Sequence, residues 1–253
     1  MKTEMIFGLH SVQAILKTAP QRILNIYALQ GRSDQRLQKI LQSAQTNGIA
    51  VATTSRQKLD EMCQDENHQG LVAVCTPGEI QDETFLFKLI ENLSEPAFLL
   101  ILDGVTDPHN LGACMRSAEA AGVHVVVAPK DKSAGLTPVA RKVACGAAEV
   151  LPFVTVTNLA RTLKKLQDKG VWLYGTSGKA EKSIYETELT GSIAILMGAE
   201  GDGMRRLTSE TCDHLMNIPM AGMVSSLNVS VATGVCLFEA ARQRRGLKDV
   251  RSI

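Results

Sequence analysis

Apolar positions in the second half of the chain gather in short continuous runs, with amphipathic stretches between them. The runs are AFLLILDGV, VHVVVAP, VLPFVTV, VWLYGTS and SIAILMGAE. Runs of this kind are typical of parallel strands that are buried on both faces. Helical spacing of apolar residues covers residues 111–121, 159–169 and 228–244, and a glycine follows the first two of these stretches. A short helix is also expected over 138–145. The alternation predicts an α/β domain whose parallel sheet is covered by helices.

The first part of the chain shows a shorter alternation of the same kind. The pattern predicts helices over 8–16 and 36–47, and strands over 23–29, 49–52 and 71–75. Residues 77–96 open with Pro-Gly, are acidic and contain one short amphipathic helix, which is typical of a connection between domains. The expected organisation is therefore a small α/β domain over 1–76, a linker over 77–96, a second domain over 97–246 and a tail over 247–253.

The composition is that of a soluble globular protein. The chain has 253 residues, of which 45% are hydrophobic and 21% charged. No apolar run approaches the roughly 18 residues that a membrane span needs, and the N-terminus lacks the pattern of a signal peptide. The six cysteines form no CxxC pair, and with five scattered histidines they make no zinc pattern. We expect a cytoplasmic protein without a bound metal.

The formal net charge of +1 argues against indiscriminate binding of nucleic acid. The charge is unevenly distributed, however. Residues 1–76 carry 8 basic and 6 acidic side chains, residues 77–96 carry 1 and 5, and residues 97–253 carry 18 and 15. Both ends are mildly basic, so local patches could contact RNA.

Three clusters of polar residues and glycines follow predicted strands of the second domain, where ligands gather in parallel sheets. The first, over 102–123, has a polar turn that caps a helix and one arginine, Arg116, among small residues. The second, over 195–207, places Glu200 beside three glycines without the spacing of a dinucleotide or P-loop motif, which disfavours a nicotinamide-dependent dehydrogenase. The third, over 218–244, leads through two serines into a helix start at Asn228. No G-x-S-x-G pattern surrounds those serines.

In this order, the three clusters resemble the three motifs of the SpoU (TrmH-like) branch of the SPOUT methyltransferases, over about 97–244. The segments GLHSVQAIL and HQGLVA resemble the ribosomal-protein-like substrate-binding domain that precedes the catalytic domain in many members. The stretches DGVTDPHNLGACMRSAEAAGVH and SSLNVSVATGVCLFEA are most similar to the bacterial members that methylate a guanosine ribose of 23S ribosomal RNA.

The resemblance implies a catalytic α/β domain with a parallel sheet and a trefoil knot, a homodimer, and S-adenosylmethionine as cofactor. The positions that match the family's cofactor contacts are Gly198, Ile218 and Leu227, with Met220 and the turn of Thr176 and Ser177 close by. The positions that match its catalytic centre are Asn110, Arg116, Glu200, Ser226 and Asn228.

The implied reaction is attack of a ribose 2′-oxygen on the sulfonium methyl group, which needs alignment and removal of one proton. The family's arginine, here Arg116, is proposed as the base, but a guanidinium stays protonated in proteins. We therefore expect Arg116 to hold an RNA phosphate and Glu200 to orient the hydroxyl. The first domain is expected to bind the RNA through basic side chains, for which the candidates are Arg32, Arg36, Lys39, Arg56 and Lys58.

Two other functions fit the same residues. A member of the same family that acts on transfer RNA would share the chemistry and differ in substrate. A non-enzymatic RNA-binding assembly factor would keep the fold, but the full set of polar motif positions argues against it.

Overall fold

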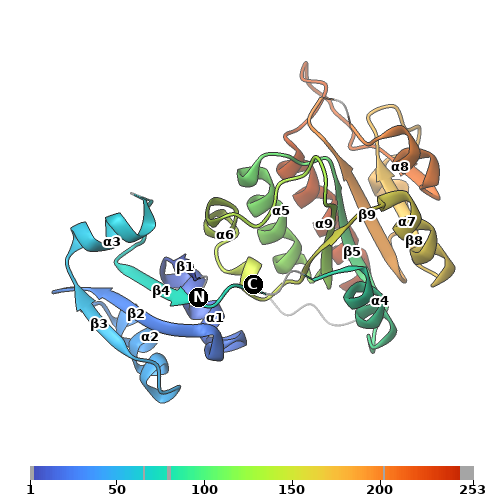
Figure 1. The fold of residues 1–253 in the computed structure, drawn as a ribbon. Coiled ribbons are helices and arrows are strands. Elements are labelled where there is room, and N and C mark those ends of the chain that lie inside the picture. The colour runs from blue at the N-terminus through green and yellow to red at the C-terminus, as the bar shows by residue number, and fades with distance from the viewer. Residues whose placement is uncertain (1–2, 65, 79–80, 202, 246–253) are drawn as a thin grey trace. The chain divides into compact units, whose positions relative to one another are not determined.

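The computed structural model describes residues 3–64, 66–78, 81–201 and 203–245, and the chain divides into two compact units. The first unit combines residues 1–79 with 136–150, and the second combines 80–135 with 151–253. A segment from the middle of the chain is thus part of the N-terminal unit. Each unit has its own β-sheet with helices packed against it (Figure 1).

The first unit is a four-stranded sheet between two layers of helices. The strand order is β1-β4-β2-β3, with β4 antiparallel to its neighbours and β3 parallel to β2. Helices α1 and α2 cover one face, and α3 covers the other with Leu59 and Cys63. The elements are β1 (Glu4–Phe7), α1 (Leu9–Thr18), β2 (Ile23–Leu29), α2 (Gln35–Thr46), β3 (Val51–Thr54), α3 (Arg56–Cys63) and β4 (Leu71–Cys75).

The middle segment 136–150 covers one edge of this sheet. It contains α6 (Pro138–Val143), which packs on the edge strand β1, and a short 3-10 turn (Ala147–Glu149) beside α1. The side chain of Glu149 is buried, and its carboxylate pairs with Arg141 at 2.7 Å and with Arg22 at 3.6 Å. An uncovered edge strand offers free backbone groups to other chains, so the segment also protects the sheet.

The second unit contains a six-stranded sheet in which every strand pair is parallel. The strand order is β10-β8-β9-β5-β6-β7, and the predicted α/β class with a parallel sheet is confirmed. The strands are β5 (Phe98–Asp103), β6 (Val125–Pro129), β7 (Phe153–Val156), β8 (Trp172–Thr176), β9 (Ile193–Gly198) and β10 (His214–Met216).

Helices lie on both faces of this sheet (Figure 1). On one side α5 (Pro108–Ala121) packs against α9 (Val229–Arg245). On the other side lie α4 (Glu83–Glu91), α7 (Leu159–Asp168) and α8 (Arg206–Thr211). Helix α4, predicted in the acidic connecting stretch, buries Leu86 completely in the core of the second unit and packs beside β7.

The six cysteines all lie in the described part of the chain and are unpaired. Burial raises the pKa of the Cys114 thiol to about 11 and those of Cys212 and Cys236 to about 12. At neutral pH these groups are therefore thiols that act as small apolar side chains. Within the described residues, no helix is both long and apolar enough to cross a membrane.

Candidate active site

A cavity of about 910 Å³ lies where β8, β9 and β10 end. Because these strands are parallel, their carboxyl ends meet at one edge of the sheet. The residues that line the cavity come from the segments that follow the three strands and from the start of α9. All five predicted cofactor contacts are among them: Thr176, Gly198, Ile218, Met220 and Leu227.

Position 198, at the end of β9, requires a glycine because two backbone segments approach each other closely there. The chain turns directly after it, and Ala199 and Gly203 pair through two backbone hydrogen bonds of 3.0 Å. The returning backbone at Gly203 and Met204 then crosses Gly198 so closely that an added Cβ would lie less than 3.0 Å from both residues. Only glycine allows this crossing, which forms one wall of the cavity.

Glu200, carried by this turn, joins the three sequence clusters. Its Oε1 atom accepts hydrogen bonds from the Asn110 side chain at 3.1 Å, from the Asn228 side chain, and from the Val229 backbone N–H at 3.4 Å. Asn228 also donates to Asn110 Oδ1 at 3.0 Å. A single carboxylate oxygen thus connects α5, the glycine turn and the start of α9.

Both asparagines are held by the helices that carry them. Asn228 precedes α9, and its Oδ1 accepts from the Ser230 backbone N–H at 2.9 Å, so its amide NH₂ must face Glu200 and Asn110. Asn110 lies in the first turn of α5. The cap of that helix is Asp107, whose carboxyl pKa is lowered by the hydrogen bond from the His109 backbone N–H.

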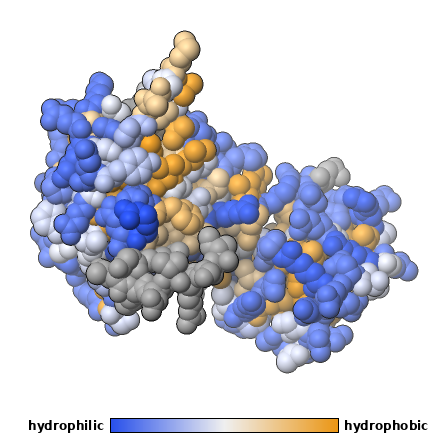
Figure 2. Space-filling view, turned by 180° about the vertical axis from the view of Figure 1, so that it is seen from behind, coloured by the Kyte–Doolittle hydropathy of each residue, from blue (hydrophilic) through white to orange (hydrophobic). Residues whose placement is uncertain are grey.

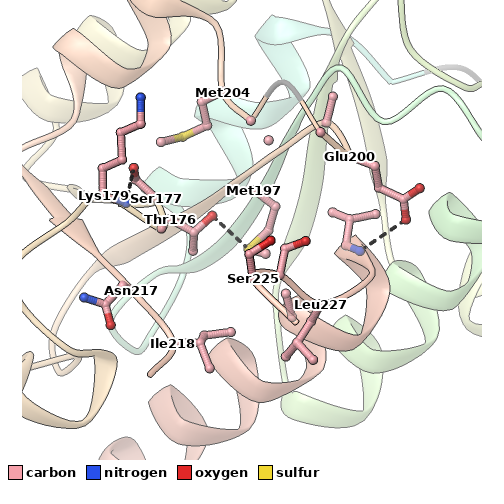
Figure 3. Close-up of a pocket in the computed structure, with 18 of the residues that line it drawn as sticks. Thr176, Ser177, Lys179, Met197, Glu200, Met204, Asn217, Ile218, Ser225 and Leu227 are labelled. Carbon is pink, nitrogen blue, oxygen red and sulfur yellow. Dashed lines mark hydrogen bonds between the residues drawn. The ribbon is translucent and has the colours of Figure 1, made fainter. Parts of the chain in front are cut away.

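The walls of the cavity combine apolar side chains with a few polar groups. Met197, Ile218 and Leu227 face it, and Glu200 lies beside the start of α9 (Figure 3). The Thr176 hydroxyl donates to the Leu196 carbonyl at 2.9 Å, which fixes that side chain at the end of β8. Lys179 is exposed and lines the cavity on the opposite side from Glu200.

These features fit an amphipathic cofactor such as S-adenosylmethionine. An apolar wall suits an aromatic base, and the exposed Lys179 suits the carboxylate of the amino-acid end. Among the residues that the structure describes, no group of three or more His, Cys, Asp or Glu is arranged to hold a metal ion.

The predicted catalytic residues divide into two sets. Glu200, Ser226 and Asn228 line the cavity, and Asn110 contacts two of them. Arg116 is exposed on α5 and is not among the lining residues. Ser177, expected beside the cofactor together with Thr176, also lines the cavity. Several other lining residues were not predicted, and most lie next to a predicted position or in the same segment: Lys179, Met197, Met204, Asn217 and Ser225.

Two family models match the chain. The model described as the SpoU rRNA Methylase family matches residues 97–238. The model described as RNA 2'-O ribose methyltransferase substrate binding matches residues 5–81. The two matches fall on the catalytic and substrate-binding regions expected from the motifs.

Relatives match over nearly the whole chain. The 23S rRNA (guanosine-2'-O-)-methyltransferase RlmB of Pasteurella multocida is 58% identical over 243 residues, 96% of this chain and 99% of that protein. The RlmB protein of Escherichia coli K12 is 56% identical over 242 residues, with coverages of 96% and 99%. The solved structure of the SpoU methyltransferase AviRb of Streptomyces viridochromogenes in complex with AdoMet has the same fold, with a TM-score of 0.78 at 20% identity and coverages of 96% and 91%. The chain therefore belongs to the SpoU family of RNA methylases, as the resemblance implied.

Proposed function

We propose that this protein transfers the methyl group of S-adenosylmethionine to the 2′-oxygen of a guanosine in 23S ribosomal RNA. The observation that carries the proposal is the junction at Glu200, which brings all three sequence clusters together beside one cavity. The names of the relatives, which match over 96% of this chain, support the same substrate.

The cofactor supplies an activated methyl group and a neutral leaving group, so the protein has to align the ribose and assist the loss of one proton. Three donors occupy Oε1 of Glu200. We assign its other oxygen, Oε2, to accept a hydrogen bond from the 2′-hydroxyl. Ser226 and the two asparagines hold the ribose and the loop in place.

Arg116 has a different task from the residues that line the cavity. Its guanidinium is exposed on the helix that begins with the Asn110 turn, and it stays positively charged at every physiological pH. We assign it to hold the RNA phosphate next to the target ribose, since a guanidinium can bind a phosphate through two parallel hydrogen bonds.

We propose that the working form is a homodimer. One face of the second unit carries a band of apolar side chains (Figure 2). The exposed large apolar residues of this unit include Val231 and Phe238 on α9, and Met223 and Val224 just before it. Apolar patches that contain a helix face are typical of interfaces between subunits.

We place the reaction in the cytoplasm. The substrate is ribosomal RNA, and the six unpaired cysteines are consistent with a reducing compartment.

We further propose that residues 1–76 capture the RNA and that residues 97–246 transfer the methyl group. Strands β1, β2 and β3 are parallel to one another, so the segments after them lie along one edge of the first unit. Five basic side chains lie on these segments or on the helices they begin, and we call them the basic edge: Arg32, Arg36, Lys39, Arg56 and Lys58. Arg36 contacts the His10 ring at 2.8 Å, and Lys58 pairs with Glu61 at 3.4 Å on the surface.

Reversing two charges of the basic edge, Arg36→Glu with Arg56→Glu, is expected to weaken binding of a 23S rRNA fragment by roughly 10-fold or more at about 0.1 M salt. The salt dependence should also become shallower, because fewer counterions are released. Lys17→Glu is the matched control, because Lys17 is exposed on the last turn of α1, away from the basic edge. Equal losses in the control and the double variant would contradict a localised RNA contact. Deleting residues 1–76 is a poorer test, because it would also uncover segment 136–150.

The function is tested by incubating the protein with radiolabelled S-adenosylmethionine and either 23S rRNA fragments or transfer RNA, followed by mapping of 2′-O-methylated nucleotides. We expect one guanosine of the 23S rRNA to be labelled. If only transfer RNA is labelled, the protein is a tRNA methyltransferase of the same family instead. Cofactor binding without methylation of either RNA would indicate an assembly factor.

A further inference from the structure

A fully buried carboxylate, Asp103, lies at the end of β5 in the second unit and is not part of the proposed catalytic set. In the sheet it is paired with Gly198 on the neighbouring strand β9. A buried carboxylate is costly to desolvate unless hydrogen bonds or an opposite charge compensate it. The groups that meet Asp103 therefore indicate what the carboxylate does.

Both oxygens of Asp103 face one residue, Arg205. Oδ2 accepts a hydrogen bond from the Arg205 backbone N–H at 2.9 Å, and Oδ1 lies 3.3 Å from the Arg205 Nε atom. Among the described residues Oδ1 has no hydrogen-bond partner of good geometry. The guanidinium of Arg205, which is 45% exposed, also reaches the Asp131 carbonyl at 3.3 Å. The hydrogen bond of good geometry that Asp103 accepts is therefore the one from the Arg205 backbone N–H.

Arg205 follows the turn that carries Glu200. The turn leaves the sheet at Gly198, and its returning end crosses Gly198 at Gly203 and Met204, directly before Arg205. The leaving end is fixed because β9 pairs with strands on both sides. The bond from Asp103 fixes the returning end at the first residue after the crossing.

We infer that Asp103 is a positioning residue that holds the returning end of the glycine turn and thereby places Glu200 and the Gly203–Met204 wall of the cofactor cavity. Gly203, Met204 and Glu200 all line the cavity, and Glu200 in turn orients Asn110 and Asn228. Without the bond, the returning end is joined to the sheet through the Ala199–Gly203 pair of the turn itself, and Arg205 has lost its backbone contact with β5. The inference rests on the proposed function in one respect, since it takes S-adenosylmethionine as the occupant of this cavity.

The test compares S-adenosylmethionine binding by calorimetry in three variants of the full chain. Asp103→Ala removes the acceptor and is expected to weaken binding roughly 10- to 100-fold, the range that small misplacements of a site cause. Asp103→Asn keeps a weaker, uncharged acceptor and should lose only several-fold. Arg205→Lys keeps the positive charge and the backbone N–H, and should bind within about twofold of wild type, because that backbone bond is unchanged.

A second readout separates positioning from general stability. Amide hydrogen exchange in a peptide that includes residues 199–206 should accelerate in Asp103→Asn but not in Arg205→Lys, while exchange in α7 stays unchanged. Wild-type cofactor affinity in a folded Asp103→Ala protein would overturn the inference. If Asp103→Ala does not fold, equal affinity and exchange in the other two variants would overturn it. These measurements need no RNA, so an incorrect choice of RNA substrate would leave their outcome unaffected.

Discussion

Replacing Gly198 by alanine is expected to weaken binding of S-adenosylmethionine by more than about 100-fold. The new methyl group would overlap the backbone of Gly203 and Met204. Strand β9 cannot move away because β5 and β8 hold it on both sides, so the returning end of the turn must lift off and open the cavity wall. Strain of about 3 kcal/mol, the upper end of the usual cost of over-packing, corresponds to a loss in affinity of roughly 150-fold. Calorimetric titration with the cofactor measures this directly.

Gly178→Ala is the matched control for this substitution. Gly178 also lines the cavity, but an added Cβ there meets no atom within 4 Å. Its affinity for the cofactor should stay within a few-fold of wild type, because open space imposes no steric cost. A Gly198→Ala protein with unchanged affinity would show that the crossing of the two backbone segments does not form the binding site.

Replacing Arg116 by lysine is expected to lower kcat for RNA methylation by roughly 100-fold while leaving cofactor affinity unchanged. Lysine keeps the charge but cannot form the two parallel hydrogen bonds of a guanidinium with a phosphate. Loss of one positioned donor of this kind typically costs about 100- to 1,000-fold in rate. Because Arg116 does not line the cavity, cofactor binding should be insensitive to the change. Single-turnover methylation assays and calorimetry provide the two measurements.

Arg161→Lys serves as the comparison, because Arg161 is also an exposed helical arginine of the second unit, where it pairs with Glu83 at 3.5 Å. Its methylation rate should match wild type. Near wild-type turnover of Arg116→Lys at neutral pH would contradict both the phosphate contact proposed here and a role as base. A loss that appears only in KM for the RNA would limit Arg116 to ground-state binding.

The secondary structure followed closely from the periodicity of apolar residues. The predicted strands 23–29 and 71–75 agree with β2 and β4 to the residue, and the predicted helix 159–169 agrees with α7 within one residue. The elements without a prediction are short or polar: β1 has four residues, and α3 buries only Leu59 and Cys63. Local patterns of that length carry too little information to separate a strand or helix from a loop.

The middle segment shows where local patterns stop being informative. A helix over 138–145 was expected from the sequence, and α6 is present there. Its membership in the first unit, through contacts with β1 and the buried Glu149, depends on partners more than a hundred residues earlier in the chain. The apolar runs are similar in composition, so the sequence does not show which strands are neighbours in the sheet. The pairing of β9 with β5 is one example.

The sequence by itself determined the α/β class, the positions of most strands and helices, and the family motifs that contain the site residues. Those properties depend on side-chain periodicity and residue type, which a sequence displays directly. Only the tertiary structure decided that Glu200 receives three donors on one oxygen, that Gly198 lies under a returning backbone segment, and that Asp103 binds the backbone of Arg205. Each of these contacts depends on the path of the chain in space. Two of the donors, at Val229 and Arg205, are backbone N–H groups, which every residue except proline has. No pattern of residue types therefore identifies such partners in advance.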